Sequence, residues 1–147
     1  MNRRTFLGLL GSAPLLAGVP SPADALRHEA RRFPLPRPRD LAGTDLTLTA
    51  RVATVDLGPT TATAWTLDGR MPGPTIRLRR GEAANILLRN ELPEETILHW
   101  HGLNVPEAAD GHPRFAIGPG EEYRYSFEVK DRAGLYWYHP HTHGRTA

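Results

Sequence analysis

Residues 44–53 read Thr-Asp-Leu-Thr-Leu-Thr-Ala-Arg-Val-Ala, and this stretch indicates the fold class. Its apolar side chains recur at every second position, at Leu46, Leu48, Ala50 and Val52. A period of two residues is typical of a β-strand that turns one face to a core and the other to solvent. The stretch therefore predicts a half-buried strand.

Further segments of the chain continue this pattern. Strands are predicted over residues 61–67, 75–79, 84–90, 96–102, 123–129 and 134–139. Turn signals separate most of them, at Asp68-Gly69, Pro72-Gly73-Pro74, Gly81-Glu82 and Pro93-Glu94-Glu95, and a long loop is predicted over residues 104–120. The sequence shows no internal repeat and no helical period of useful length. It predicts an all-β sandwich or barrel of about seven short strands.

Composition limits the function. The 147 residues include 14 Gly and 14 Pro, which favours short strands joined by turns over a helical bundle. The net charge of +2 supplies no large basic field for nucleic acid. Cysteine is absent, which excludes disulfides, thiolate nucleophiles, iron–sulfur clusters and a self-contained blue-copper site with its Cys ligand.

The first 25 residues have the features of an export signal. Arg3-Arg4 is followed by an apolar run over residues 6–19, and Ala23-Asp24-Ala25 has the small-x-small pattern of a cleavage site. The run is too short to span a bilayer, which takes about 20 apolar residues. The arginine pair predicts a twin-arginine signal, and an ordinary secretory signal is the alternative. Either way the protein is expected to be periplasmic or secreted, with no membrane span.

Residues 26–43 are rich in arginine and proline. The spaced prolines predict an extended lead-in that contains a solvated His28, and a polybasic docking segment is the alternative. The domain proper is expected to occupy residues 44–147.

Histidines concentrate in two motifs. One is His99-Trp100-His101-Gly102 and the other is His139-Pro140-His141-Thr142-His143-Gly144. Residues i and i+2 of a strand face the same side, so each His-x-His projects two imidazoles together. Neutral imidazole binds Zn, Cu, Fe and Ni. The spacing fits one shared metal ion or two neighbouring ions.

Three other residues lie near these motifs. His143 shares the parity of His139 and His141, which makes it a possible further ligand. His112 lies in a turn and is expected to be a solvated loop histidine. Asp110 precedes Gly111, as a turn-forming residue would.

With Gly69-Arg70-Met71-Pro72-Gly73-Pro74-Thr75-Ile76 before them, the two motifs resemble the N-terminal cupredoxin domain of multicopper oxidases. This family includes laccases, bilirubin oxidases and bacterial copper-resistance oxidases. Residues 98–103 are similar to its first copper motif and residues 134–141 to its second. The resemblance runs from about residue 46 to residue 144 and implies a cupredoxin-like Greek-key β-sandwich or barrel.

The resemblance also implies roles for individual residues. His99 matches a type 2 copper ligand, and His101, His139 and His141 match type 3 ligands. His143 usually lies outside the coordination shell in the family. Asp110 is similar to an acidic residue that feeds protons to the copper cluster. Trp100 and Trp137 are expected to serve packing.

The chain also departs from the family pattern. Its members have two or three cupredoxin domains, a type 1 copper site with a Cys ligand, and further cluster histidines in a C-terminal domain. This chain has no Cys and matches half of the histidines of the three-copper cluster. The domain over residues 44–147 is therefore expected to be incomplete and to lack its last strand or strands.

Three interpretations remain open at this point. The chain is the front part of an exported oxidase that couples one-electron oxidation of a small substrate to reduction of O₂ to water. Alternatively it is a non-catalytic periplasmic copper-binding module, or one subunit of a split oxidase completed by a partner chain. The ligands alone also allow a zinc hydrolase, but no general base is placed for one.

Overall fold

The computed structural model describes residues 37–142, which form strands and two short 3₁₀ helices. The export signal over residues 1–25, His28 with the first part of the lead-in, and His143 lie outside the described residues. The strands are β1 (Asp40–Ala42), β2 (Asp45–Asp56), β3 (Thr61–Leu67), β4 (Thr75–Arg77), β5 (Ala83–Glu91), β6 (Leu98–His101), β7 (Glu122–Glu128) and β8 (Trp137–Pro140); the helices are η1 (Glu107–Ala109) and η2 (Pro113–Phe115). Within this part of the chain no helix has the length and apolar character needed to cross a membrane.

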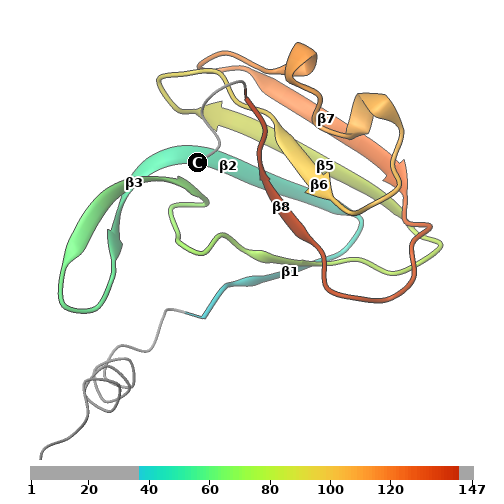
Figure 1. The fold of residues 1–147 in the computed structure, drawn as a ribbon, viewed down its shortest axis with the longest axis horizontal. Helices are drawn as coiled ribbons and strands as arrows, with labels where there is room; N and C mark the ends of the chain where they lie inside the picture. Colours follow the sequence, from blue (N-terminus) through green and yellow to red (C-terminus); the bar gives the residue numbers. More distant parts are fainter. Residues whose placement is uncertain (1–36, 143–147) are drawn as a thin grey trace, which may run out of the picture. The chain divides into compact units, whose positions relative to one another are not determined.

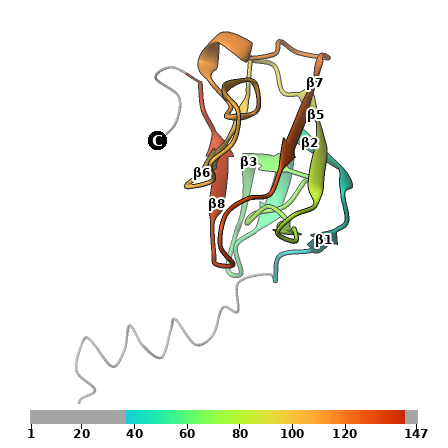
Figure 2. The same cartoon turned by 90° about the vertical axis from the view of Figure 1, so that its right-hand side faces the viewer.

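The strands form two layers (Figures 1 and 2). One layer is a four-stranded sheet in the order β3-β2-β5-β7, in which β2 and β5 are parallel and the other pairs antiparallel. The other layer contains the antiparallel ribbon β6–β8, which lies across the face of that sheet. The short strands β1 and β4 pair in parallel. The prediction of an all-β sandwich is confirmed.

The core lies between the layers because each strand turns every second side chain inward. In β5 the buried positions are Ala84, Ile86, Leu88 and Asn90, and the residues between them are more exposed. The ribbon contributes Leu98 and Trp100, and the core continues through Leu48, Ala50, Tyr125 and Phe127. Removal of these apolar surfaces from water, at about 25 cal/mol per Å², stabilises the docking of the ribbon on the sheet.

Most strands follow the predicted ranges, and the differences have physical causes. Residues 40–42, which fall in the predicted lead-in, form β1, where Asp40 makes an ion pair of 3.1 Å with Arg77 of β4. The strand predicted over 134–139 begins only at Trp137, because the chain before it bends with Leu135 fully exposed. The loop over 104–120 contains η1 and η2, and His112 caps η2 by accepting a hydrogen bond from the Arg114 backbone amide.

A buried amide ties the chain before β6 to the sheet. Asn90, at 1% exposure, donates from Nδ2 to the carbonyls of Glu94 and Ile117 at 2.8 and 2.9 Å. Its Oδ1 accepts from the Leu92 amide at 3.0 Å. A buried side-chain amide with its hydrogen bonds satisfied is a rigid anchor. The entry into β6, which carries the first histidine motif, is thereby fixed relative to β5.

Candidate metal centre

The β6–β8 ribbon places four aromatic rings on one face. Its register pairs His99 with His139 and His101 with Trp137. Because side chains alternate across a strand, these four residues share the outward face. Trp100 and Tyr138 form the pair between them and turn to the core. The alternation that buries the ribbon on one side therefore gathers the histidines on the other.

His99 is the central ring of the group. Its ring centroid lies 5.5 Å from that of His101, 5.4 Å from that of His139 and 5.2 Å from that of His141. One ring nitrogen from each of His99, His101 and His139 lies within 4.8 Å of the other two. His141 joins the group because its backbone amide donates to the Ile97 carbonyl at 2.8 Å, which continues the ribbon pairing. The four predicted ligands are thus brought together.

Backbone carbonyls fix the protonation pattern of three of the rings. The Nδ1 atoms of His99, His139 and His141 lie 2.7, 2.8 and 3.0 Å from the carbonyl oxygens of Asp110, Pro140 and Gly111. A carbonyl oxygen only accepts, so in each ring Nδ1 carries the donated proton and the neutral imidazole keeps its lone pair on Nε2. Neutral imidazole with its second nitrogen held by a carbonyl is the form that ligates copper and similar metals. The donor set therefore fits copper.

The loop at residues 110–111 supplies two of those carbonyls. Gly111 has a φ of +73°, and a Cβ atom there would collide with the backbone carbonyl of Leu98. Only glycine lets the loop come this close to β6. The Asp110 carboxylate lies on the Nδ1 side of His99, with Oδ1 3.1 Å from that nitrogen, and 44% of its side chain is exposed. One loop thus reaches a histidine of each motif, His99 and His141.

Two tyrosines hold the ribbon from its inner side. Tyr125 of β7 is fully buried, and its hydroxyl accepts from the Leu98 backbone amide at 2.8 Å. Tyr138 of β8 donates to the Pro74 carbonyl at 2.6 Å. Burial raises the pKa of both hydroxyls well above the usual tyrosine range. Both side chains therefore stay neutral and keep these hydrogen bonds through the neutral pH range.

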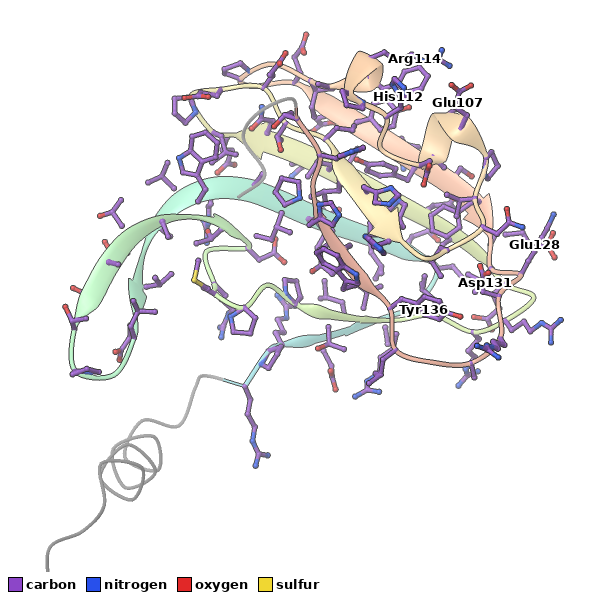
Figure 3. All side chains as sticks on the ribbon, viewed as in Figure 1. Glu107, His112, Arg114, Glu128, Asp131 and Tyr136 are labelled. Atoms are coloured by element: carbon purple, nitrogen blue, oxygen red, sulfur yellow. The ribbon has the colours of Figure 1, made fainter. Side chains whose placement is uncertain are left out.

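Of the other residues near the motifs, His112 and Trp100 lie apart from the cluster, whereas Trp137 packs on it. His112 is exposed at the start of η2, and Arg114 of η2 forms an ion pair of 2.8 Å with Glu107 of η1 (Figure 3). Its Nδ1 accepts the Arg114 amide, as expected of a loop histidine. Trp100 packs in the core as predicted, at 4% exposure, whereas Trp137 is 56% exposed and packs on the histidines.

Three residues of this region are not predicted from the sequence as parts of the site: Trp137, Gly111 and Tyr125. Trp137 has a readable signal, because it lies two positions before His139 and so shares its face. Gly111 and Tyr125 act through contacts with backbone atoms of β6. Such contacts leave no pattern in a sequence.

Comparisons with known proteins agree with this geometry. A family model described as multicopper oxidase matches residues 49–147. A copper resistance protein A homolog of Pseudomonas syringae pv. tomato is 36% identical over 147 residues, covering 96% of this chain and 24% of the relative. The multicopper oxidase mco of Staphylococcus aureus is 45% identical over 80 residues, covering 54% of this chain and 18% of the relative.

A solved structure shows the same fold. The laccase-like multicopper oxidase CueO of Ochrobactrum sp. superposes with a TM-score of 0.73 at 33% identity, covering 78% of this chain and 27% of that one. The chain belongs to the multicopper oxidase family. It spans about a quarter of the length of the relatives that match most of it.

Proposed function

We propose that the chain binds copper and forms the N-terminal part of an exported multicopper oxidase. One observation carries the proposal: four imidazoles meet on one face of the β6–β8 ribbon, and three of them have Nδ1 committed to a carbonyl. Family membership supports the assignment of His99 as a type 2 ligand and of His101, His139 and His141 as type 3 ligands. His143 stays a possible further ligand.

Copper held here would supply part of the cluster at which the whole oxidase reduces O₂ to water with electrons from a small reducing substrate. The residues of this chain hold the four imidazoles in place, and in three of them a carbonyl accepts from Nδ1–H, so that the neutral ring offers Nε2 to the metal. The remaining ligands and the type 1 site would come from further cupredoxin domains or from a partner chain. The length of the relatives supports such domains.

Asp110 is proposed to deliver protons to this centre. Its carboxylate lies against the His99 ring on one side and is 44% exposed on the other. A carboxylate in that position can exchange protons with solvent and pass them toward the reacting oxygen species. Its backbone carbonyl has the separate task of orienting His99.

Export by the twin-arginine pathway is proposed from residues 1–25. Replacement of Arg3 and Arg4 by lysine is expected to stop export, as measured by the periplasmic fraction of the expressed protein. Unchanged export in this double variant would favour an ordinary secretory signal.

The copper assignment is tested with histidine variants of the purified chain. We expect His99→Ala, and the double change His139→Ala with His141→Ala, to lower the copper bound per chain as measured by metal analysis after gel filtration. His112→Ala is the matched control, because His112 is exposed and lies outside the cluster. Unchanged copper content in both ligand variants would contradict the assignment.

A further inference from the structure

The indole of Trp137 lies against two of the histidine rings. Its centroid is 4.5 Å from that of His101 with an interplanar angle of 25°, and 4.4 Å from that of His139 with an angle of 27°. The two imidazoles are 5.8 Å apart, much less than rings on opposite faces of the indole would be. One face of the indole therefore covers both imidazoles.

Core packing does not account for this placement. Trp137 is 56% exposed and lies on the ribbon face opposite Trp100 and Tyr138, which belong to the core. The register places it directly across from His101, and the period of two places it on the same face as His139. Leaving a large apolar ring in water is unfavourable. Within residues 37–142 its ring contacts are with the two stacked imidazoles, one from each strand.

His101 depends on this contact more than the other ligands do. Within residues 37–142, the rings of His99, His139 and His141 are each held by a carbonyl, whereas the ring of His101 has no such hydrogen bond and is exposed. Its ring stacks on the indole at an interplanar angle of 25°, whereas its contacts with the rings of His99 and His139 are at larger angles, 68° and 46°. A ligand that is ordered before the metal arrives loses less conformational entropy on binding.

We propose that Trp137 is a positioning residue of the metal centre. It fixes the ring planes of His101 and His139 for one shared metal ion or for two neighbouring metal ions. The proposal rests on the proposed function, because it assigns the indole a role toward bound copper. An imidazole that ligates a metal takes on part of its positive charge. The electron-rich indole face then attracts the ring more strongly, so metal binding and stacking reinforce each other.

The test uses the full chain loaded with Cu(II) and three variants. Trp137→Leu removes the aromatic face, and Trp137→Phe restores part of it. Trp65→Leu is the matched control, because Trp65 is also a strand tryptophan, is 43% exposed and pairs with Val52 far from the histidines in sequence. The measurements are the Cu(II) dissociation constant by chelator competition and the electron paramagnetic resonance spectrum of the bound ion. Circular dichroism checks that each variant is folded.

We expect Trp137→Leu to bind Cu(II) about tenfold more weakly, since two aromatic pairs are lost. Its spectrum should broaden or shift because the His101 ring is no longer held in one orientation. Trp137→Phe should recover most of the wild-type spectrum, and Trp65→Leu should match the wild type in both measurements.

Two results would overturn the proposal, and they differ in what they say of the function. A Trp137→Leu variant with the affinity and spectrum of the wild type would remove the positioning role and leave copper binding intact. A wild-type chain that binds no Cu(II) would contradict both the positioning role and the proposed copper binding. If Trp137→Leu is unfolded, Trp137→Phe decides: it should keep most of the wild-type spectrum, and a folded Trp137→Phe chain that has lost that spectrum would count against the role of the aromatic face.

Discussion

Two ribbons of this domain share antiparallel strand pairing but differ in the side chains on their outward faces. One is β6–β8. The other is the outer half of the β2–β3 hairpin, where residues 52–56 pair with residues 61–65 beyond the last pair between β2 and β5 (Figure 1). Each presents a tryptophan to solvent, Trp137 in the first and Trp65 in the second. Strand pairing is therefore common to both and cannot by itself explain the histidine cluster.

The difference lies in the outward side chains and in what braces the strands. On the hairpin, Trp65 lies across from Val52, and the next pair on that face is Thr54 with Thr63. On β6–β8 the outward face carries histidines, and the loop at residues 110–111 supplies carbonyls that accept from them. From the opposite layer, the Tyr125 hydroxyl accepts a hydrogen bond from the Leu98 amide. A metal-binding ribbon thus needs ligands on one face and fixed backbone behind them.

The largest effect is expected from Gly111→Ala. The new methyl group would collide with the Leu98 carbonyl, so the loop must move away and withdraw the carbonyls that orient His99 and His141. We expect copper binding to be lost and the free energy of unfolding to fall by more than about 3 kcal/mol. Chemical denaturation and metal analysis measure the two effects.

Gly120→Ala is the control for this change. Gly120 has a φ of +81° but no atom near its virtual Cβ, so it shares the backbone strain without the collision. It should cost only about 1–2 kcal/mol and leave copper binding unchanged. Equal behaviour of the two variants would show that the close approach at Gly111 does not matter to the site.

A smaller effect is expected from Tyr125→Phe. Loss of the hydroxyl leaves the buried Leu98 amide without its acceptor, which costs about 1–3 kcal/mol of unfolding free energy. Tyr136→Phe is the matched control: its hydroxyl donates to the Arg132 carbonyl at the surface (Figure 3), and its loss should cost less than about 0.5 kcal/mol. If thermal unfolding shifts equally in both, Tyr125 does not brace the ribbon.

Alkaline pH should weaken the domain through Tyr125 and Tyr138. Burial raises the pKa of both hydroxyls in the folded state, so above about pH 10 the unfolded chain loses protons that the folded chain retains. Stability is therefore complete below pH 10 and falls as the pH rises further, by up to about 1.4 kcal/mol per pH unit for each tyrosine. Denaturation midpoints measured between pH 8 and pH 11 should show a shallower decline in Tyr138→Phe. A decline identical to that of the wild type would contradict the role of Tyr138.

The smallest effect is expected from Trp65→Leu on stability. The side chain is 43% exposed on the outer hairpin, and its pair with Val52 is worth roughly 0.2–1 kcal/mol. Thermal unfolding should change by only a few degrees. A loss as large as that caused by Gly111→Ala would mean that the hairpin is as essential as the ribbon.

Much of the layer structure could be predicted from the sequence, because alternation is a local signal. The strand predicted over 61–67 is β3, and those over 84–90 and 123–129 are β5 and β7 within a residue. Strand β1 was not predicted, since three residues are too few to show a period and their partner β4 lies more than 30 positions away. Such pairing is set by tertiary contacts.

The histidine cluster was predictable for a similar reason, because side chains two positions apart on a strand share one face, so each His-x-His motif places two imidazoles side by side. What surrounds the ligands was not predictable. Asp110 and Gly111 act on His99 and His141 through main-chain oxygens, which every residue possesses. Only the close approach of one loop, permitted by one glycine, selects these two carbonyls.

The pairing of β6 with β8 has a consequence for the order of events during biosynthesis. The strands are adjacent in space, but the segment between them in the sequence comprises residues 102–136. Contacts across so long a stretch form late, since closing the loop costs chain entropy before any contact repays it. The first His-x-His leaves the ribosome long before the second. A nascent chain thus first exposes only His99 and His101, and the four imidazoles come together only after the tertiary structure has closed.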